Sequence, residues 1–206
     1  MKRLFDLIIA VLALTALSPL LVTIALLVVI DSRGPVFFRQ KRIGQLERPF
    51  VLWKFRTMRH RNPDEIDQVE EGVITTARDS RITAIGRLLR AASLDELPQL
   101  YNVLQGTMSM VGPRPIMPEQ MAAVPAEHKE RFCVRPGITG WAQVNGRRGL
   151  DWMVQLELDC WYARHHSLSL DLRIMLSTIP TVLRGSGVYG EASANWRAYL
   201  DRGNDG

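Results

Sequence analysis

The sequence predicts an α/β fold that is mostly α-helical, with one small β-hairpin and an N-terminal re-entrant membrane hairpin of helix-break-helix form. Three observations predict it: an uncharged run over residues 7–30, a Ser-Pro pair within that run, and a remainder in which one β-rich stretch is followed by amphipathic helical stretches. At 206 residues the chain is long enough for one compact domain with an appendage. We expect a membrane hairpin at 1–30, a compact cytoplasmic domain with amphipathic membrane-surface helices at 31–185, and a C-terminal tail at 186–206.

The uncharged run has the length and composition of a membrane-crossing helix, since it consists mostly of Leu, Ile, Val and Ala. Its flanks are basic on both sides, with Lys2 and Arg3 before it and five arginines or lysines among residues 33–48 after it. Because basic residues favour the cytoplasmic side of a membrane, both ends are drawn to the same side. One straight span cannot satisfy both.

Pro19 offers a solution, because a proline inside a helix removes one backbone hydrogen bond and clashes with the preceding turn, which favours a sharp bend. The two arms, residues 7–18 and 20–30, would each be roughly 16 to 18 Å long, about half of a hydrocarbon core of roughly 30 Å. We therefore predict a hairpin that enters and leaves the membrane at the same face. The Ser18 hydroxyl is available to donate a hydrogen bond to the backbone carbonyls that the break exposes. A kinked but complete span and a cleaved signal peptide are the alternatives, although the run is long for a signal peptide.

The stretch after the membrane run predicts a β-hairpin and then a loop. Two β-rich segments, VFFRQKRIG and RPFVLWKFRTM, are separated by a Gly-containing turn, and residues 60–72 are polar, acidic and aperiodic. Further on, Ile82, Ile85 and Leu89 recur at helical spacing with arginines between them. This pattern is typical of a basic amphipathic helix, which ordinarily turns its apolar stripe to the core.

Two more helices are predicted in the C-terminal third. The segment DWMVQLELDCWYARHH is rich in aromatic residues, and SLDLRIMLSTIPTVLRG is amphipathic, interrupted by Pro180 and ended by Gly185. Either helix can rest its apolar face on lipid or on the core. The tail from Ser186 is expected to be weakly ordered.

The composition narrows the classes of site. Lys and Arg number 26 against 21 Asp and Glu, which favours anionic partners without selecting among nucleic acid, phospholipid and sugar nucleotide. Cys133 and Cys160 have no disulfide or zinc spacing, so we interpret both as reduced thiols. The four histidines form no metal-binding motif, so we expect no transition-metal site, whereas a hard cation held by carboxylates remains open.

The sharpest local feature is the segment SLDELPQLYNVLQG. Ser93 and Glu96, three residues apart, predict a capping box, which places Asp95 and Glu96 in the first turn of a helix. Acidic residues are common there because the helix dipole stabilises them, so a purely structural explanation is available. The position also suits a carboxylate that attacks phosphorus, with its neighbour exchanging a proton or helping to hold a divalent cation.

Basic loops follow this acidic pair. The segment GPRP fixes Arg114 between two prolines, which lowers the entropy lost when a guanidinium binds a phosphate. Arg90 is the arginine of the amphipathic helix that lies nearest to the acidic pair in sequence. These two arginines, together with the basic and aromatic segment over residues 135–148, predict an anionic substrate that carries ring systems. That segment, RPGITGWAQVNGRR, adds Arg135, Trp141, Gln143, Asn145, Arg147 and Arg148.

Several segments occur in a distinctive order along the chain: SP in the N-terminal run, KFRTM, SLDELPQLYNVLQG, MSMVGPRP, RPGITGWAQVNGR, LELDCWY and DLRIM. Together they closely resemble the bacterial sugar transferases, specifically the small monotopic phosphoglycosyl transferases, over residues 2–189. The resemblance implies a magnesium-dependent enzyme at the cytoplasmic face of the bacterial inner membrane. It would transfer a sugar 1-phosphate from a UDP-sugar to polyprenyl (undecaprenyl) phosphate and release UMP, as the first membrane step of glycoconjugate assembly.

The resemblance also implies roles for individual residues. Asp95 matches the nucleophile that forms a phosphosugar-aspartyl intermediate and a position for Mg²⁺, and Glu96 matches its partner carboxylate. The broken helix of the family matches Ser18 and Pro19. The expected substrate-binding set, from the resemblance and the basic loops together, is Lys54, Arg56, Arg90, Arg114, Arg135, Gln143, Asn145 and Arg147.

Two other classes of function remain open at this point. A membrane-tethered basic module would bind polyanions without turnover, and a metal-dependent phosphatase or nucleotide hydrolase would release phosphate or sugar phosphate into water. The expected partners are the UDP-sugar, polyprenyl phosphate and membrane lipid, with no nucleic acid and with a homodimer left open. The sugar cannot be predicted, because specificity rests on the shape of a pocket.

Overall fold

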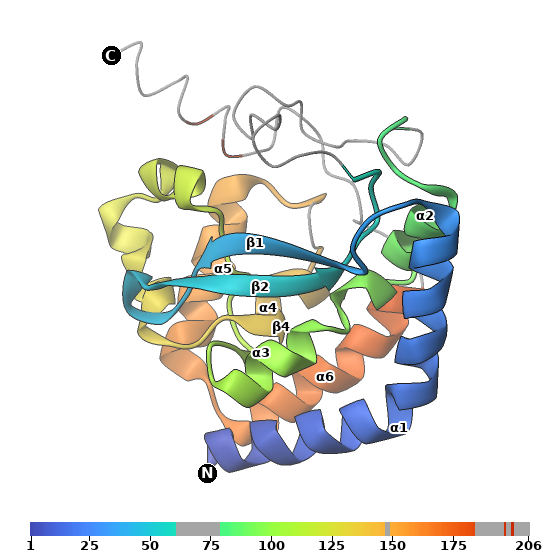
Figure 1. Ribbon diagram of the computed structural model, residues 1–206. Coiled ribbons are helices and arrows are strands. Elements are labelled where there is room, and N and C mark those ends of the chain that lie inside the picture. Colours follow the sequence, from blue (N-terminus) through green and yellow to red (C-terminus); the bar gives the residue numbers. More distant parts are fainter. Residues whose placement is uncertain (61–78, 147–148, 184–195, 197–198, 200–206) are drawn as a thin grey trace.

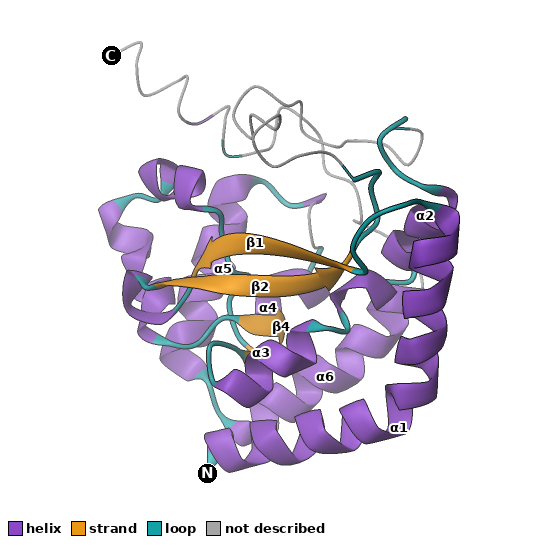
Figure 2. Cartoon of the chain, viewed as in Figure 1, coloured by secondary structure: helices purple, strands orange, loops and turns teal. Residues whose placement is uncertain are grey.

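The structure, a computed structural model, describes residues 1–60, 79–146, 149–183, 196 and 199. It is mostly helical with one antiparallel β-hairpin, as the sequence predicts, and it adds a small parallel sheet that was not expected (Figures 1 and 2). The helices are α1 (Lys2–Asp31), α2 (Ala84–Ala91), α3 (Gln99–Gln105), α4 (Trp141–Val144), α5 (Trp152–His165) and α6 (Leu168–Leu183). The strands are β1 (Phe37–Ile43), β2 (Pro49–Phe55), β3 (Ser109–Val111) and β4 (Gly137–Thr139). Short 3₁₀ turns cover Gln45–Glu47, Leu94–Glu96, Pro118–Ala123 and Ala126–Cys133.

Helix α1 is helical throughout, yet Figure 1 shows it as two arms that meet at a pronounced bend. Pro19 lies inside the helix and has no N–H to donate to the carbonyl of Thr15, one turn earlier. The Ser18 hydroxyl donates to that carbonyl instead, at 2.8 Å. The predicted use of Ser18 is therefore confirmed. Of the described helices, α1 alone is long and apolar enough to cross a membrane. In its most apolar stretch of 18 residues, 11% of the residues are buried against the rest of the protein.

The N-terminal end of α1 is bound to the rest of the fold by charged side chains. Lys2 pairs with Asp171 of α6, which is fully buried. Asp6, also fully buried, accepts the Ser109 hydroxyl of β3 at 2.9 and 3.0 Å. Arg3 donates to two backbone carbonyls in α3. The first arm is thus fixed to α3, β3 and α6.

The C-terminal end of α1 is held in a similar way. Asp31 accepts a hydrogen bond from the N–H of Ile85, in the first turn of α2, at 2.9 Å. Arg56, just after β2, is buried and donates to three carbonyls at the end of α1, those of Val28, Ser32 and Arg33. Both ends of the apolar helix therefore contact one and the same domain.

The β-hairpin is paired as an antiparallel ladder in which Phe38 lies opposite Lys54 and Gln40 lies opposite Leu52. Because side chains alternate along a strand, these even-numbered residues share one face with Arg42. Leu52 on that face is 3% exposed, so the face is turned toward the domain. The hairpin thereby carries Lys54 and Arg42 inward together.

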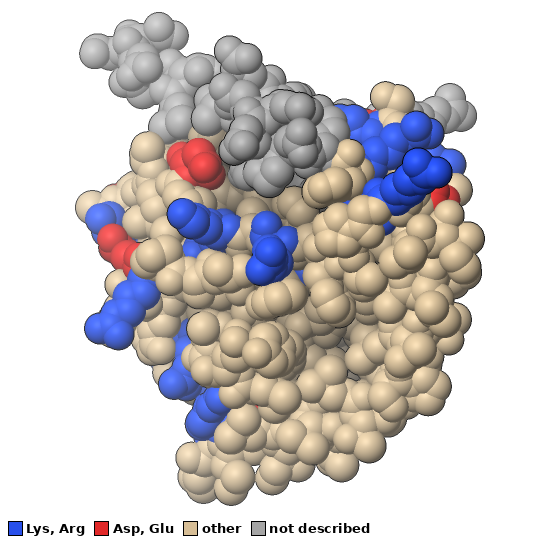
Figure 3. All heavy atoms as spheres, viewed as in Figure 1, with Lys and Arg blue, Asp and Glu red and all other residues tan. Residues whose placement is uncertain are grey.

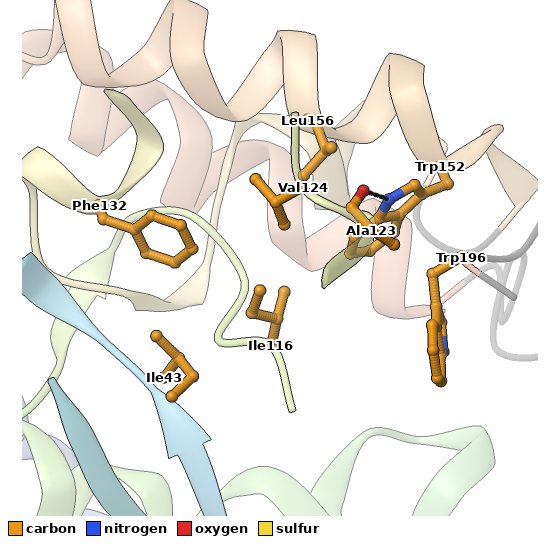
Figure 4. Close-up of a cluster of buried hydrophobic side chains, with 8 residues drawn as sticks. All are labelled: Ile43, Ile116, Ala123, Val124, Phe132, Trp152, Leu156 and Trp196. Carbon is orange, nitrogen blue, oxygen red and sulfur yellow. Dashed lines mark hydrogen bonds between the residues drawn. The ribbon is translucent and has the colours of Figure 1, made fainter. Parts of the chain in front are cut away.

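A core cluster packs the end of the hairpin against α5 and the 3₁₀ turns. Trp152 of α5 donates its indole N–H to the carbonyl of Ala123 at 2.9 Å, as drawn in Figure 4. Trp196 is 7% exposed and belongs to this cluster, and the Tyr199 hydroxyl donates to Asp151. These two residues of the predicted tail therefore contact the domain, and the rest of residues 186–206 lies outside the described residues. The whole cluster is Ile43, Ile116, Ala123, Val124, Phe132, Trp152, Leu156 and Trp196.

Helices α2, α5 and α6 follow the predictions with two exceptions, and α4 lies in a segment for which a loop was predicted. Helix α2 contains Ile85 and Leu89 as expected, but Ile82 precedes it and pairs with Met58 in an isolated bridge. Pro180 lies inside α6 and does not interrupt it. One face of α6 exposes a row of apolar side chains at helical spacing, namely Leu168, Leu172, Leu176 and Ile179. Apart from His60, the predicted loop over residues 60–72 lies outside the described residues.

Candidate active site

The backbone around the acidic pair differs from the predicted capping box. Ser93 has a left-handed conformation, with φ of 55°, and its side chain caps nothing. Its N–H bonds to the carbonyl of Arg90 at 3.1 Å, just after the C-cap Ala92 of α2, and its carbonyl accepts the N–H of Glu96 at 3.3 Å, so Ser93 links the end of α2 to a short 3₁₀ turn. Asp95 and Glu96 then lie in the 3₁₀ turn Leu94–Glu96, and α3 begins only at Gln99. The predicted capping box is therefore wrong.

The 3₁₀ turn places both carboxylates beside two cations that come from other parts of the chain. Lys54 Nζ lies 2.7 Å from Glu96 Oε1 and 3.8 Å from Asp95 Oδ2. Arg114 Nη2 lies 2.7 Å from the same Glu96 oxygen. Asp95 is 8% exposed, and its carboxylate forms no hydrogen bond with the described part of the chain. The structure thus joins Lys54, Asp95, Glu96 and Arg114 in one site.

The two adjacent carboxyl groups have opposite electrostatic environments. Burial raises the pKa of Asp95, and the nearby Lys54 only partly offsets it. Burial also opposes ionisation of Glu96, but Arg114 and Lys54 hold the pKa of Glu96 well below its ordinary value. Burial lowers the pKa of Lys54, whereas the Glu96 charge raises the pKa of Arg114. Glu96 is therefore a fixed anion, and Asp95 is the more basic of the two carboxylates.

A small cavity opens next to these groups. It is lined by Lys54, Arg114, Arg42, Gln99, Leu52 and Pro115. Arg42 was not predicted as a site residue, although alternation along the predicted hairpin would have placed it on the same face as Lys54. The cationic walls of this cavity suit phosphate groups.

Arg90 is the third predicted cation that the structure brings close to the acidic pair. Its Nε donates to the Thr57 hydroxyl at 3.0 Å, and its charge acts to lower the pKa of Asp95 against the effect of burial. Arg56 is placed differently, because its guanidinium donates to the carbonyls at the end of α1. These are the contacts of a helix cap.

The predicted residues of the later loops are not gathered at the carboxylates. Arg135 donates to the carbonyl of Gly106 at the end of α3, at 3.0 Å, and Asn145 donates to the carbonyl of Trp141 at 2.8 Å. Gln143 is buried, and its amide has no hydrogen-bond partner among the described residues. Arg147 lies outside the described residues.

The predicted Mg²⁺ can be compared with the donor groups present. No group of three or more His, Cys, Asp or Glu side chains that could hold a metal occurs within the described ranges. Mg²⁺ is commonly bound by one or two carboxylates together with substrate phosphates and water. Asp95 fits such a role, because its carboxylate accepts no hydrogen bond from the described side chains and has Lys54 only at 3.8 Å, while Glu96 is bound by two cations at 2.7 Å.

Known proteins are similar to this chain over most of its length. An uncharacterized sugar transferase of Bacillus subtilis is 41% identical over 188 residues, which cover 91% of this chain and 90% of that protein. The undecaprenyl-phosphate glucose phosphotransferase of Komagataeibacter xylinus is 46% identical over 86% of this chain. The UDP-glucose:undecaprenyl-phosphate glucose-1-phosphate transferase of Escherichia coli is 43% identical over 87% of this chain. The chain spans only 35% and 39% of these last two proteins.

The family model described as bacterial sugar transferase matches residues 1–185 and so includes every part of the site described above. The match covers α1, the hairpin and the carboxylate pair in one stretch. The chain belongs to the bacterial sugar transferase family.

Proposed function

We propose that the protein transfers a sugar 1-phosphate from a UDP-sugar to undecaprenyl phosphate, yielding undecaprenyl-diphosphate-sugar and UMP. The observation that carries the proposal is the unequal pair of carboxylates: Glu96 is neutralised by Lys54 and Arg114, while Asp95 beside it is buried and not hydrogen-bonded. The similarity to the glucose phosphotransferases of K. xylinus and E. coli supports the same reaction class. Family membership makes turnover, rather than simple binding of polyanions, the expected activity.

Asp95 is the proposed nucleophile. One of its carboxylate oxygens attacks the phosphorus that bears the sugar, the bond from that phosphorus to the UMP oxygen breaks, and UMP leaves with the bonding electrons. An acyl phosphate remains on Asp95. A phosphate oxygen of the lipid then attacks the same phosphorus and expels the Asp95 carboxylate. No proton is gained or lost in either displacement when the attacking groups are ionised.

Glu96 is better suited to holding cations than to moving protons. A carboxyl group whose pKa lies well below its ordinary value is a weak proton acceptor near neutral pH. Its Oε1 instead fixes Lys54 and Arg114, whose remaining N–H groups can face phosphate oxygens in the cavity beside them. Mg²⁺ bound at Asp95 and the substrate phosphates would supply further neutralisation of the phosphate charge.

The membrane placement that we propose is monotopic, with the domain at the cytoplasmic face. Both ends of α1 contact the same domain, through Lys2 at one end and Arg56 at the other. A straight spanning helix would separate these ends by the thickness of the bilayer. In the view of Figure 3, the surface over most of α1 carries no charged side chain. The apolar row on α6 is a second surface suited to lipid.

The direct test is an assay of the purified protein in detergent with Mg²⁺, undecaprenyl phosphate and a panel of UDP-sugars, with UMP as the product measured. Formation of UMP together with a lipid-linked sugar supports the proposal. Release of free sugar phosphate without lipid product would indicate a hydrolase, and binding of UDP-sugar without UMP would indicate a binding module. Asp95→Asn provides the matched inactive control.

A further inference from the structure

A buried ion pair lies behind the proposed active site, between Arg131 of the 3₁₀ turn Ala126–Cys133 and Asp159 of α5. Arg131 is 3% exposed and Asp159 is 2% exposed. The Arg131 Nε and Nη2 atoms donate to one oxygen, Asp159 Oδ2, at 3.2 and 2.6 Å. The other oxygen, Oδ1, is buried and has no hydrogen-bond partner among the described residues.

A gain in folding stability does not by itself explain this pair. Removing two charges from water costs several kcal/mol per ion, and replacing a buried pair by apolar side chains is often neutral or stabilising. The partial satisfaction of Asp159 increases that cost. Phe132, next to Arg131 in the chain, and Leu156, one turn before Asp159, belong to an apolar core cluster. A role other than stability is therefore worth seeking.

The second contact of Arg131 leads to the active site. Its Nη2 also donates to the backbone carbonyl of Arg114 at 2.8 Å. Arg114 stands between Pro113 and Pro115, so the two neighbouring residues have no N–H with which to fix the loop. The side chain of Arg114 in turn reaches Glu96 at 2.7 Å.

An unbroken series of contacts therefore runs from the buried pair to the carboxylates. Asp159 orients Arg131, Arg131 holds the backbone of Arg114, and Arg114 binds Glu96. The charge of Asp159 also contributes, after those of Glu96 and Asp95, to raising the pKa of Arg114. Both effects act on the same guanidinium.

We propose that Arg131 and Asp159 are positioning residues that fix the Arg114 guanidinium on Glu96 and toward the transferred phosphate. This inference rests on the proposed function. Neither residue touches the substrate in this scheme, and their effect passes through the Arg114 backbone.

The test replaces the pair by apolar residues of similar total volume, Arg131→Met with Asp159→Val. The melting temperature is expected to stay the same or rise, because the buried charges are removed together. The kcat for UMP formation is expected to fall by roughly 10- to 100-fold, the scale of a small misplacement of a catalytic group. Arg131→Lys keeps the charge but cannot reach both partners as a planar fork does, so its kcat should be intermediate.

A double-mutant cycle separates positioning from a general effect on the fold. If the pair acts through Arg114, then Arg114→Lys should reduce kcat much less in the Met/Val background than in the wild type. Additive losses would overturn the inference, as would wild-type kcat in the double replacement. The matched control is the exposed pair Arg164 and Glu130, which joins the same two elements at 2.7 Å. Replacing both by Gln should leave kcat unchanged.

Failure of the proposed function would look different. If the wild type forms no UMP with any UDP-sugar, the reaction assignment is wrong, and the inference is then decided by calorimetric titration with pyrophosphate. Loosening of Arg114 predicts a Kd that is raised at least about 5-fold by the Met/Val replacement and unchanged by the Gln/Gln control. An equal Kd in both variants, or no binding to either, would overturn the positioning role.

Discussion

Lys54 Nζ lies 3.8 Å from Asp95 Oδ2, which is too far for a hydrogen bond, although the same nitrogen is 2.7 Å from Glu96. The lysine is therefore close enough to Asp95 to attract negative charge there and does not block the oxygen that would attack. Glu96 accepts the strong contacts from Lys54 and Arg114. Their surroundings thus give the two neighbouring carboxylates different roles: Asp95 is left available to attack, and Glu96 holds the two cations.

Asp95→Asn is expected to raise the stability of the folded protein at pH 7. Burial raises the pKa of Asp95, so the charged form is less favourable in the folded state than in the unfolded state. The advantage of the amide should appear as the pH rises above about 3.9, the ordinary value for Asp, and be complete above the raised pKa. Thermal unfolding over this range measures it, and a lower melting temperature at pH 7 would contradict the environment assigned to Asp95.

Glu96→Gln is expected to act in the opposite direction. Because Arg114 and Lys54 hold the pKa of Glu96 well below its ordinary value despite burial, its charge contributes stability above about pH 4.3 that is lost as the pH falls through the lowered pKa. At pH 7 the replacement removes the charge that pairs with Lys54 and Arg114, whose side chains are 15% and 35% exposed, so after solvent screening it should cost about 1 kcal/mol. The difference from wild type should shrink in acid. Equal melting temperatures at pH 7 would show that the ion pairs are not formed.

Arg114→Lys and Arg56→Lys form a contrasting pair. Arg114→Lys retains the charge and loses the fork, so kcat should fall by roughly 100-fold, as when a donor aimed at transition-state charge is removed. Its melting temperature should change little.

Arg56→Lys should do the reverse, because one ammonium cannot serve the three carbonyls at the end of α1. We expect a loss of roughly 1 to 3 kcal/mol of stability with kcat near wild type in the folded fraction. A loss of kcat at full stability would instead return Arg56 to the substrate-binding set.

These two arginines show where sequence reasoning reached its limit. The uncharged run, the Ser-Pro break and the alternation of the β-hairpin are local patterns, and the structure has a long apolar helix with Pro19 inside it and an antiparallel β-hairpin at these places. The partner of a long cation is not local: Arg56 contacts carbonyls 23 to 28 residues away, and Arg131 reaches a carbonyl 17 residues away. No spacing rule indicates such partners. The sequence could therefore identify candidate basic residues by type, but it could not show which of them lie at the carboxylates and which bind backbone carbonyls elsewhere.

The capping box shows a second kind of limit. Ser93 and Glu96 have the spacing of a capping box, and the structure places Asp95 and Glu96 together in the first turn that follows Ser93. The same serine also follows the C-cap Ala92 of α2, and it does so in a left-handed conformation that is uncommon for residues other than glycine. Two local rules competed for one residue. Leu89 of α2 packs with Val28 of α1 and Phe55 of the hairpin, contacts that no local rule at Ser93 takes into account.

The topology of α1 gives a prediction in whole cells. Cys133 is exposed and Cys160 is buried, so Cys133→Ser provides a background for labelling. In that background, a cysteine inserted after Met1 and Leu46→Cys should both resist a membrane-impermeant maleimide until the cells are opened. Labelling of one site in intact cells would establish a complete span. Pro19→Ala should increase such labelling, because it restores the missing backbone hydrogen bond and removes the cause of the bend.

The covalent step gives the final prediction. With a UDP-sugar and Mg²⁺ but no lipid phosphate, Asp95 should become phosphoglycosylated and release one UMP per active site. Mass spectrometry of rapidly quenched protein should find the adduct on the peptide that contains Asp95, and kinetics with both substrates should be ping-pong. Asp95→Asn should remove adduct and turnover while the fold is kept, since the amide has nearly the same shape and is a poor nucleophile.

In contrast, Glu96→Gln should still form some adduct, because the nucleophile is present and only its neighbouring cations are disturbed. Because the raised pKa of Asp95 reduces its ionised fraction in acid, the rate of adduct formation should begin to fall at a higher pH than for an ordinary Asp. If UMP appears only when the lipid phosphate is also bound, and no adduct forms, then the lipid attacks the UDP-sugar directly and Asp95 has another role.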